Sequence, residues 1–279
     1  MQRRARIGLA ATAVLASIAG VCPALADGKL EARYVASLAG IPIGSGTWIV
    51  EIGESRYLAA ASGSTAGLLR LFVGGQGTSA ARGTLLGNRP ITSTYAATIN
   101  TQSASSAVRL AISDGDVKES KVEPPIDQDP ERVPLTAAHE HGVLDPMTAS
   151  LVRAPGTSNP VAPEACDRTL SIFDGRMRYD LKLAFKRMDT VHAEKGYSGP
   201  AVVCSVRFSP LAGYIPSRTA IKYLARQQDI EVWLAPIAGT RVLVPFRAEG
   251  PTPVGKAVLQ ATQFVTVAGP NRAAAEKTK

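Results

Sequence analysis

Apolar and polar residues alternate with a period of two through most of this chain, and this pattern restricts the fold more than any other feature. It is clear in residues 31–38 (EARYVASL), 44–52 (GSGTWIVEI) and 176–187 (RMRYDLKLAFKR). Successive side chains of a strand point to opposite faces, so this period is typical of β-structure. Helical periodicity is scarce, and nothing suggests a parallel sheet. We therefore predict a mainly β fold, either a large curved antiparallel sheet or an open half-barrel, with one or two short helices.

Further strands are expected on both sides of an irregular segment. Residues 123–134 (EPPIDQDPERVP) are rich in proline and acid and divide the chain into halves. Residues 74–83 (GGQGTSAARG) are expected to form turns, and 65–72 (TAGLLRLF) could form a short helix. The remaining predicted strands are 56–62, 92–100, 106–113 and 116–124 in the first half, and 168–175, 201–208, 230–236, 240–249 and 255–267 in the second.

One helix is expected in the segment 144–154 (LDPMTASLVRA). Asp145 can cap it, and Pro146 suits the first helical position, where no backbone N–H is needed. Met147, Leu151 and Val152 would then share one face. Such a helix could close one open end of a curved sheet.

The first 26 residues have the features of an export signal. Arg3, Arg4 and Arg6 give a positive start, and residues 7–21 (IGLAATAVLASIAGV) are uncharged and mostly apolar. Small residues then lead to Ala26, after which a signal peptidase is expected to cut. The apolar run is short for a membrane span, although an uncleaved anchor is the alternative.

Cleavage at this point would leave a mildly basic protein in the periplasm. It would remove three of the 31 Lys and Arg residues and no acid, so that 28 basic residues face 23 acidic ones. This charge suits work beside anionic lipid or polysaccharide, and it is too scattered to indicate nucleic acid. We expect one β-rich domain over 27–268, a disordered tail at 269–279, and no membrane span after cleavage.

Two of the three cysteines would remain after cleavage, Cys166 and Cys204, because Cys22 leaves with the signal. An even number of cysteines in an oxidising compartment favours a disulfide. A metal site would need more ligands close by, and neither cysteine has a neighbouring Cys or His. A thiol nucleophile would need an unpaired cysteine. We therefore predict a disulfide that joins two strands across an intervening hairpin.

Several separate stretches carry a family resemblance. They are 34–48 (YVASLAGIPIGSGTW), 144–152 (LDPMTASLV), 166–181 (CDRTLSIFDGRMRYDL), 197–214 (YSGPAVVCSVRFSPLAGY) and 232–264 (VWLAPIAGTRVLVPFRAEGPTPVGKAVLQATQF). Together they resemble the bacterial domain-of-unknown-function family 3108. The resemblance implies an exported, mainly β envelope protein of Gram-negative bacteria and brings no established activity. The implied architecture is similar to periplasmic half-barrels of the lipoprotein-carrier kind, in which a curved sheet and a helical lid enclose an apolar cavity.

The sequence FDGR contains the pair Asp174–Gly175 between two alternating runs. Asp-Gly favours a two-residue hairpin turn, because both central positions take positive φ. Asp174 could instead act in a glycan hydrolase with Asp180 or Glu231 as the second carboxylate. That chemistry requires a defined separation across a cleft. We favour the turn.

Two histidines in HEH, His139 and His141, could bind a metal together with Asp145 if they shared one strand face. They lie between the proline-rich segment and the expected helix, where exposed polar residues are ordinary. The sequence also contains no Gly-x-Ser-x-Gly elbow and no glycine-rich phosphate loop that leads into a clear helix. We therefore predict no metal, no cofactor and no catalytic residue.

The chain is predicted to be a non-enzymatic periplasmic protein that supports the cell envelope by binding an apolar or lipid-like ligand. The alternatives are an envelope scaffold that binds a partner protein or peptidoglycan, and the glycan hydrolase. Aromatic side chains are usually core, but some could line a cavity, and arginines at its mouth could meet a phosphate or carboxylate group. The candidate ligand-binding residues are Tyr34, Trp48, Trp233, Phe246, Arg178 and Arg247.

Overall fold

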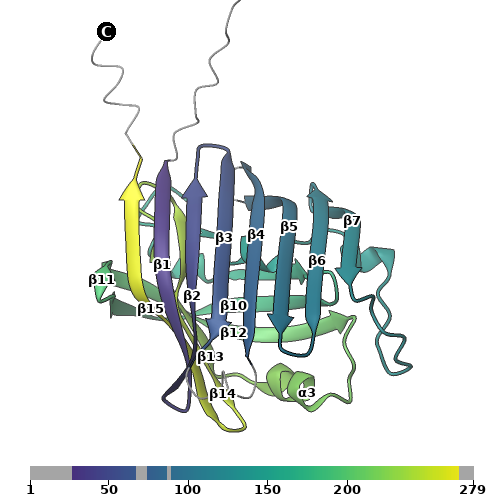
Figure 1. The fold of residues 1–279 in the computed structure, drawn as a ribbon. Coiled ribbons are helices and arrows are strands. Elements are labelled where there is room, and N and C mark those ends of the chain that lie inside the picture. The colour runs from purple at the N-terminus through teal and green to yellow at the C-terminus, as the bar shows by residue number, and fades with distance from the viewer. Residues whose placement is uncertain (1–26, 67–73, 87–88, 270–279) are drawn as a thin grey trace, which may run out of the picture.

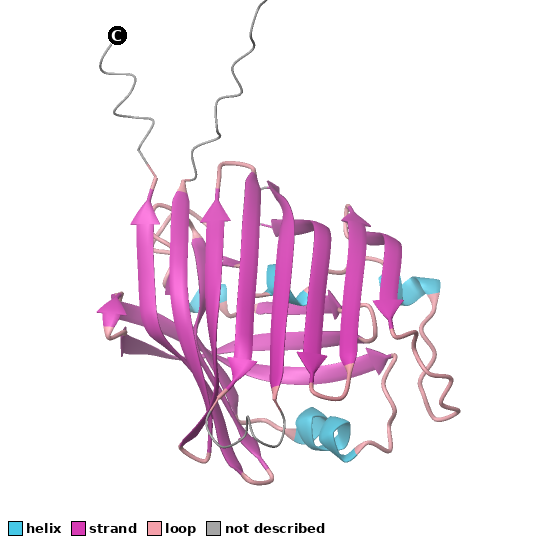
Figure 2. Ribbon diagram, in the orientation of Figure 1, coloured by secondary structure: helices cyan, strands magenta, loops and turns pink. Residues whose placement is uncertain are grey.

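The computed structural model describes residues 27–66, 74–86 and 89–269. Fifteen strands of these residues form a single sheet, and the helices are few and short (Figure 2). The predicted mainly β, antiparallel fold is therefore confirmed. The expected export signal, most of the possible helix at 65–72 and nearly all of the expected tail lie outside the described residues.

The first half of the chain is a meander in which each strand pairs antiparallel with the next. It forms the front layer in Figure 1. The irregular segment predicted after it begins where the last of these strands ends. The strands are β1 (Gly28–Leu38), β2 (Ile41–Ile52), β3 (Arg56–Thr65), β4 (Gly75–Leu86), β5 (Arg89–Thr101), β6 (Ser105–Ser113) and β7 (Asp116–Glu123).

The second half continues the same sheet, because β15 pairs antiparallel with β1 along the whole length of β1. The sheet order from there is β15-β14-β13-β12-β10-β9, with the short β8 on β14 and the short β11 on β15. The two ends of this order, β7 and β9, are not paired with each other, so the sheet is not closed. The strands are β8 (Val152–Arg153), β9 (Arg168–Phe173), β10 (Arg178–His192), β11 (Lys195–Gly196), β12 (Ser198–Ala212), β13 (Ile230–Pro236), β14 (Val242–Thr252) and β15 (Gly255–Ala268).

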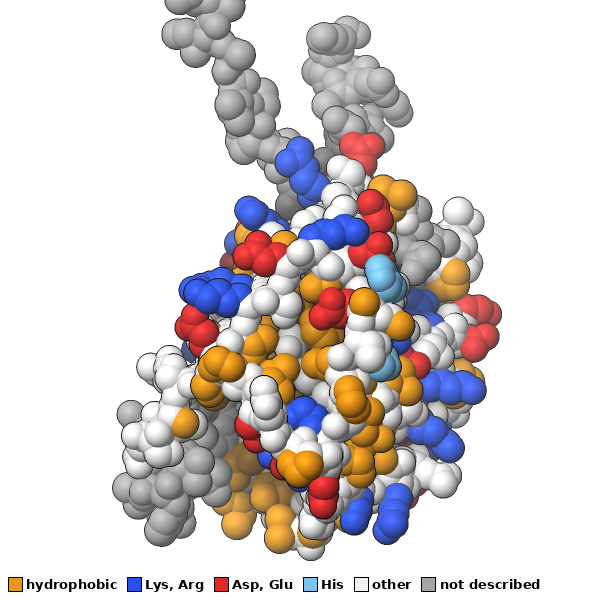
Figure 3. All heavy atoms as spheres, turned by 90° about the vertical axis from the view of Figure 1, so that its right-hand side faces the viewer, with side chains coloured by type: hydrophobic (Ala, Val, Ile, Leu, Met, Phe, Trp, Pro, Cys, Tyr) orange, Lys and Arg blue, Asp and Glu red, His pale blue; other side chains and the backbone are white. Residues whose placement is uncertain are grey.

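The sheet folds back on itself, so that β10 and β12 cross behind the front layer in Figure 1. The main hydrophobic core lies between these two layers. Figure 3 views the side that carries the β7 edge, where hydrophobic side chains line the space between the layers and charged side chains surround it. The helical elements are η1 (Ala137–Glu140), α2 (Pro146–Ala149), η2 (Pro163–Ala165) and α3 (Thr219–Arg226).

A second core covers the other face of the back layer. Trp233 of β13 faces the main core and the next residue, Leu234, faces the second. A strand buried on both faces carries a continuous apolar run instead of an alternating one, which explains the sequence VWLAP. The segment that holds β8 and η2 packs over this second face.

The predicted disulfide between Cys166 and Cys204 is confirmed, and both cysteines are fully buried in the second core. Cys204 lies in β12, whereas Cys166 lies just after η2. The bond therefore ties the covering segment to the sheet, and the expectation that it joins two strands is wrong. A disulfide indicates an oxidising compartment outside the cytoplasm. Among the described residues, no helix is long and apolar enough to cross a bilayer.

Two other local predictions need correction, and one helix was not predicted. The predicted turns at 74–83 are strand β4, whose glycines allow close packing: a Cβ on Gly83 would lie against the Ile91 carbonyl oxygen and 2.6 Å from the Tyr57 hydroxyl. Asp174 lies in a turn as predicted, but the turn has four residues instead of two, and of the pair only Gly175 takes a positive φ. The Asp174 side chain holds this turn by accepting two backbone N–H groups. Helix α3 is absent from the sequence-based prediction.

The predicted helix at 144–154 begins as expected and ends early. Asp145 Oδ1 accepts the backbone N–H groups of Met147 and Thr148 at 2.8 and 3.0 Å, and Pro146 occupies the first turn. Helix α2 nevertheless contains only four residues. The chain then pairs with β14 as strand β8, so sheet pairing replaces further helical turns.

Candidate functional site

An apolar cleft of about 460 Å³ opens between the layers. Its floor is the inner face of β2, β3 and β4, one wall is α2, and the opposite wall is formed by β14 and β15. A cleft of this size lies within the range of pockets that bind small ligands. The side chains that define it are Tyr34, Trp48, Ala61, Ser79, Tyr95, Pro146, Met147, Ser150, Pro245 and Leu259.

Strand register explains why the floor is hollow. Trp48, Ala61 and Ser79 lie side by side on neighbouring strands, and Gly46 and Gly63 form the next row. Side chains two residues apart share a face, so these rows both face the cleft. Small residues beside one large aromatic ring leave space that the opposite layer does not fill.

Tyr34 and Trp48 form the aromatic side of the cleft, with ring centroids 6.5 Å apart. The Tyr34 hydroxyl donates to the Pro245 carbonyl oxygen at 2.7 Å, which ties β1 to β14. Burial raises the pKa of Tyr34 well above its ordinary value. Trp48 is only 7 % exposed, and its indole N–H has no acceptor within the described part of the chain. A buried donor of this kind favours a ligand that brings an oxygen acceptor.

A buried polar network holds the α2 wall in place. Thr92 donates to Asp145 Oδ2 at 2.6 Å, the Thr148 hydroxyl donates to the same oxygen, and the Tyr57 and Thr148 hydroxyls lie 2.5 Å apart. Desolvation raises the pKa of Asp145, while the hydrogen bonds from Thr148 and Thr92 act in the opposite direction. The network fixes the position of Met147 against the cleft.

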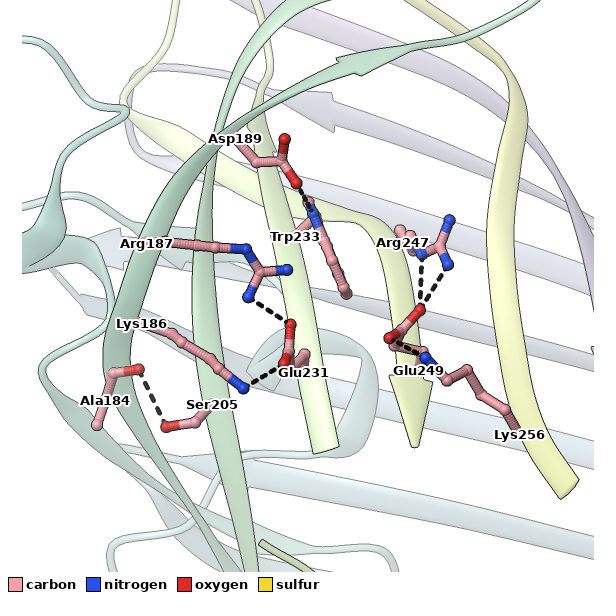
Figure 4. A network of polar contacts seen from close by, with 10 residues as sticks. All are labelled: Ala184, Lys186, Arg187, Asp189, Ser205, Glu231, Trp233, Arg247, Glu249 and Lys256. Atoms are coloured by element: carbon pink, nitrogen blue, oxygen red, sulfur yellow. Dashed lines mark hydrogen bonds and ion pairs between the residues drawn. The ribbon is translucent and has the colours of Figure 1, made fainter. Parts of the chain in front are cut away.

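A second group of candidate residues surrounds Trp233, away from the cleft. The guanidinium carbons of Arg187 and Arg247 lie 5.2 and 5.1 Å from the Trp233 ring centroid, and Figure 4 shows the ring between them. The Trp233 indole N–H donates to Asp189 Oδ2 at 2.8 Å, which is the main cause of the lowered Asp189 pKa. The ring is therefore engaged on both faces and at its edge.

Two carboxylates hold the arginines of this group (Figure 4). Glu231 pairs with Lys186 and, at 2.8 Å, with Arg187. Glu249 pairs with Arg247 at 2.5 Å and with Lys256 at 2.8 Å. Partial burial alone would raise the pKa of each glutamate, but the paired cations outweigh it and the pKa lies below the ordinary value.

The six candidate ligand-binding residues therefore lie in three places. Tyr34 and Trp48 meet in the cleft. Trp233, Arg247 and Phe246 line a separate hollow of about 600 Å³. Arg178 lies apart from both groups, where it pairs with Asp180 at 2.7 Å and donates to the Tyr179 carbonyl oxygen. The binding role of all six stays a prediction.

The carboxylates considered for hydrolysis each have a separate local partner. Asp174 holds its turn, Asp180 accepts from Arg178 and Ser171, and Glu231 belongs to the Trp233 group. Among the described residues, no side chain forms a hydrogen bond or ion pair with two of these three carboxylates.

The histidines of HEH also point to different partners. His139 Nδ1 accepts the Thr136 backbone N–H at 3.1 Å, and His141 Nδ1 lies 2.9 Å from Asp116 Oδ1. Asp145, the third suggested ligand, is buried in the network beside α2. In the described ranges, no group of three His, Cys, Asp or Glu side chains could hold a metal ion.

Sequence reasoning missed the partners that complete both groups, because they come from distant segments. Arg187 and Asp189 meet Trp233 from β10, and Thr92 meets Asp145 from β5. The abundance of small residues in the first strands was the available signal for a hollow floor, although it does not locate the hollow.

Comparisons with known proteins give a family but no activity. The model of the family described as "Protein of unknown function (DUF3108)" matches residues 33–262. No curated protein matches the chain. A β-barrel-like protein of the domain of unknown function DUF1849 from Brucella abortus, solved as a crystal structure, is 8 % identical, with a TM-score of 0.49 and coverage of 87 % of this chain and 99 % of that chain.

Proposed function

This chain belongs to the DUF3108 family, and we propose that it is a non-enzymatic periplasmic protein that binds an apolar, lipid-like ligand in the cleft between its layers. The observation that carries the proposal is the apolar cleft of about 460 Å³ with an unpartnered, buried indole N–H at Trp48. Ligand sites are commonly apolar with a few placed polar groups, and this cleft has that character.

The lining defines the chemistry of the ligand. Met147, Leu259 and the ring of Trp48 would contact an apolar chain, and the small residues of the floor leave room for it. The Trp48 N–H would donate to an ester or carboxyl oxygen near one end of that chain. A fatty acid or the acyl part of a phospholipid has this combination.

The proposed compartment rests on two observations. The buried Cys166–Cys204 disulfide needs an oxidising environment, and the chain starts with an export-like sequence. The hydrolase alternative has less support, because its three candidate carboxylates are each engaged by separate partners.

The proposal is tested by displacement of an apolar fluorescent dye, phenylnaphthylamine, from the purified protein by a fatty-acid methyl ester. Ala61 lines the cleft, whereas its neighbour Ala60 is exposed on the outer face of the same strand. Ala61→Phe should fill the cleft and weaken dye and ester binding by about tenfold or more. Ala60→Phe is the matched control and should bind like the wild type.

A second variant tests the polar contact. Trp48→Phe removes the N–H and keeps an aromatic ring, so affinity for the methyl ester should fall by about fivefold. Affinity for an alkane of equal length should change much less. The proposal is wrong if the methyl ester displaces no dye from the wild type, or if Ala61→Phe and Ala60→Phe bind the dye and the ester equally.

A further inference from the structure

Exposed aliphatic side chains gather at one end of the molecule. Ile41 begins β2, Ile99 lies near the end of β5, Val254 lies in the β14–β15 turn, and Leu224 lies in α3; they are 64, 57, 68 and 38 % exposed. Figure 1 places the β1–β2 turn, the β14–β15 turn, the end of β5 and α3 together at its lower end. We call this the lower end.

Helix α3 is amphipathic and carries no buried residue. At 100° per residue, Ile221 and Leu224 fall on one side together with two alanines, and Lys222 and Arg226 fall on the other. None of its apolar side chains reaches the core, although Ile221 is partly covered. A helix of this pattern normally buries its apolar side against something.

Basic charge accompanies these apolar side chains. Arg218, Lys222 and Arg226 lie in or beside α3, and Asp229 is the one acidic residue between 216 and 230. In the described part of the chain, none of the three forms an ion pair with an acidic side chain. The cations of the Trp233 group, in contrast, are each held by a glutamate.

We propose that the lower end docks on the surface of an anionic phospholipid bilayer. Aliphatic side chains at turn tips and on α3 would enter the interfacial region, and the three cations would lie against the lipid headgroups. The charge favours this occupant over a second copy of the chain, because two lower ends in contact would bring like charges together.

This docking surface goes beyond the proposed function and does not require an occupied cleft. The cleft extends to Ala36 and Gly44, which lie next to the β1–β2 turn at the lower end. Docking would therefore bring one end of the cleft close to the bilayer, which is where an apolar ligand would enter or leave.

The test is co-sedimentation of the exported, signal-free protein with vesicles of mixed phosphatidylglycerol and phosphatidylcholine, compared with phosphatidylcholine alone. We expect stronger binding to the anionic vesicles and a loss of binding as salt is added. The charge-reversal variant Lys222→Glu with Arg226→Glu should have an affinity for anionic vesicles that is at least about tenfold lower than that of the wild type. The matched control is Arg56→Glu with Lys195→Glu, two exposed cations of other regions.

The apolar contribution is tested by Leu224→Ser with Val254→Ser. The control is Leu86→Ser, because Leu86 is the last residue of β4, and β4 ends at the opposite end of the molecule (Figure 1). The first variant should lose several-fold in vesicle binding and the second none, with circular dichroism confirming that each is folded. The proposal is overturned if the wild type does not sediment with anionic vesicles, or if both charge variants bind equally. It is also overturned if light scattering shows a wild-type dimer that the Leu224 and Val254 changes convert to monomer without loss of vesicle binding.

Discussion

Asp145 allows a sharp test of the buried network beside the cleft. Its side chain caps α2 and accepts hydrogen bonds from the hydroxyls of Thr92 and Thr148, with no cationic partner in the described residues. Asp145→Ala removes a helix cap, worth about 1 kcal/mol, and takes the carboxylate acceptor away from two buried threonine hydroxyls, at about 1 kcal/mol each. We expect the free energy of unfolding to fall by about 3 kcal/mol.

Asp145→Asn separates the hydrogen bonds from the charge. The amide oxygen still accepts the two backbone N–H groups, and the hydroxyls of Thr92 and Thr148 can rotate to accept from the amide NH₂. Asparagine is also as good a cap as aspartate. The variant should therefore remain within about 1 kcal/mol of the wild type at neutral pH.

The pH dependence has a defined sign. Burial raises the Asp145 pKa above the ordinary value of 3.8, so the folded state holds the proton more tightly than the unfolded state. The wild type consequently loses stability as the pH rises from about 4 through the folded-state pKa, and Asp145→Asn does not. The stability of Asp145→Asn relative to the wild type should rise over that range.

Urea unfolding followed by far-UV circular dichroism, at several pH values, measures all three proteins. A role for Asp145 as cap and hydrogen-bond acceptor is refuted if Asp145→Ala lowers the unfolding free energy by less than about 1 kcal/mol, or if Asp145→Asn is as destabilised as Asp145→Ala. An unchanged gap between wild type and Asp145→Asn across the pH series would contradict the assigned pKa direction.

Three further predictions address packing, the crosslink and the charged group. Gly83→Ala should lower the free energy of unfolding by about 3 kcal/mol or prevent folding. Gly77→Ala is the control: its Cβ would lie 3.2 Å from the nearest atom, so it should lower the unfolding free energy by about 1 kcal/mol. Urea midpoints measure both. Cys204→Ser removes a crosslink between residues 38 apart in sequence and should lower the unfolding free energy by about 4 kcal/mol on the chain-entropy model. If the urea midpoint of the wild type is the same with and without reductant, the crosslink does not stabilise the fold. Glu249→Gln should weaken the hold on Arg247 and cost about 1 kcal/mol at neutral pH. Because the folded-state pKa of Glu249 lies below its ordinary 4.5, that difference should be present above about pH 4.5 and vanish as the pH falls through the folded value, and a constant difference would refute it.

Local patterns predicted most of the strands, because alternation directly reflects which side of a sheet is buried. They failed where tertiary contacts determine the local structure. In β4, glycine marks close approach to Ile91 and Tyr57 instead of a turn, and sequence alone does not distinguish the two uses. After α2, pairing with β14 ends a helix whose cap was correctly located. Helix α3 has only eight residues and no capping side chain at its start, so its local signal is short.

The candidate site was predictable only in its parts. Tyr34 and Trp48 were recognisable as aromatic residues of neighbouring strands, and register then brings them together. Whether a ring lines a cleft or fills a core depends on what the opposite layer supplies. Trp233 illustrates this limit, because Arg187 and Asp189 reach it from a strand more than 40 residues away.

Native mass spectrometry of the protein isolated gently from its native cells, followed by organic extraction, tests most directly whether the cleft holds an apolar chain. We expect an added mass on the wild type that extraction identifies as an acyl lipid, retained by Ala60→Phe and absent from Ala61→Phe. Wild-type protein that carries no added mass, or an equal load on Ala61→Phe, would contradict it.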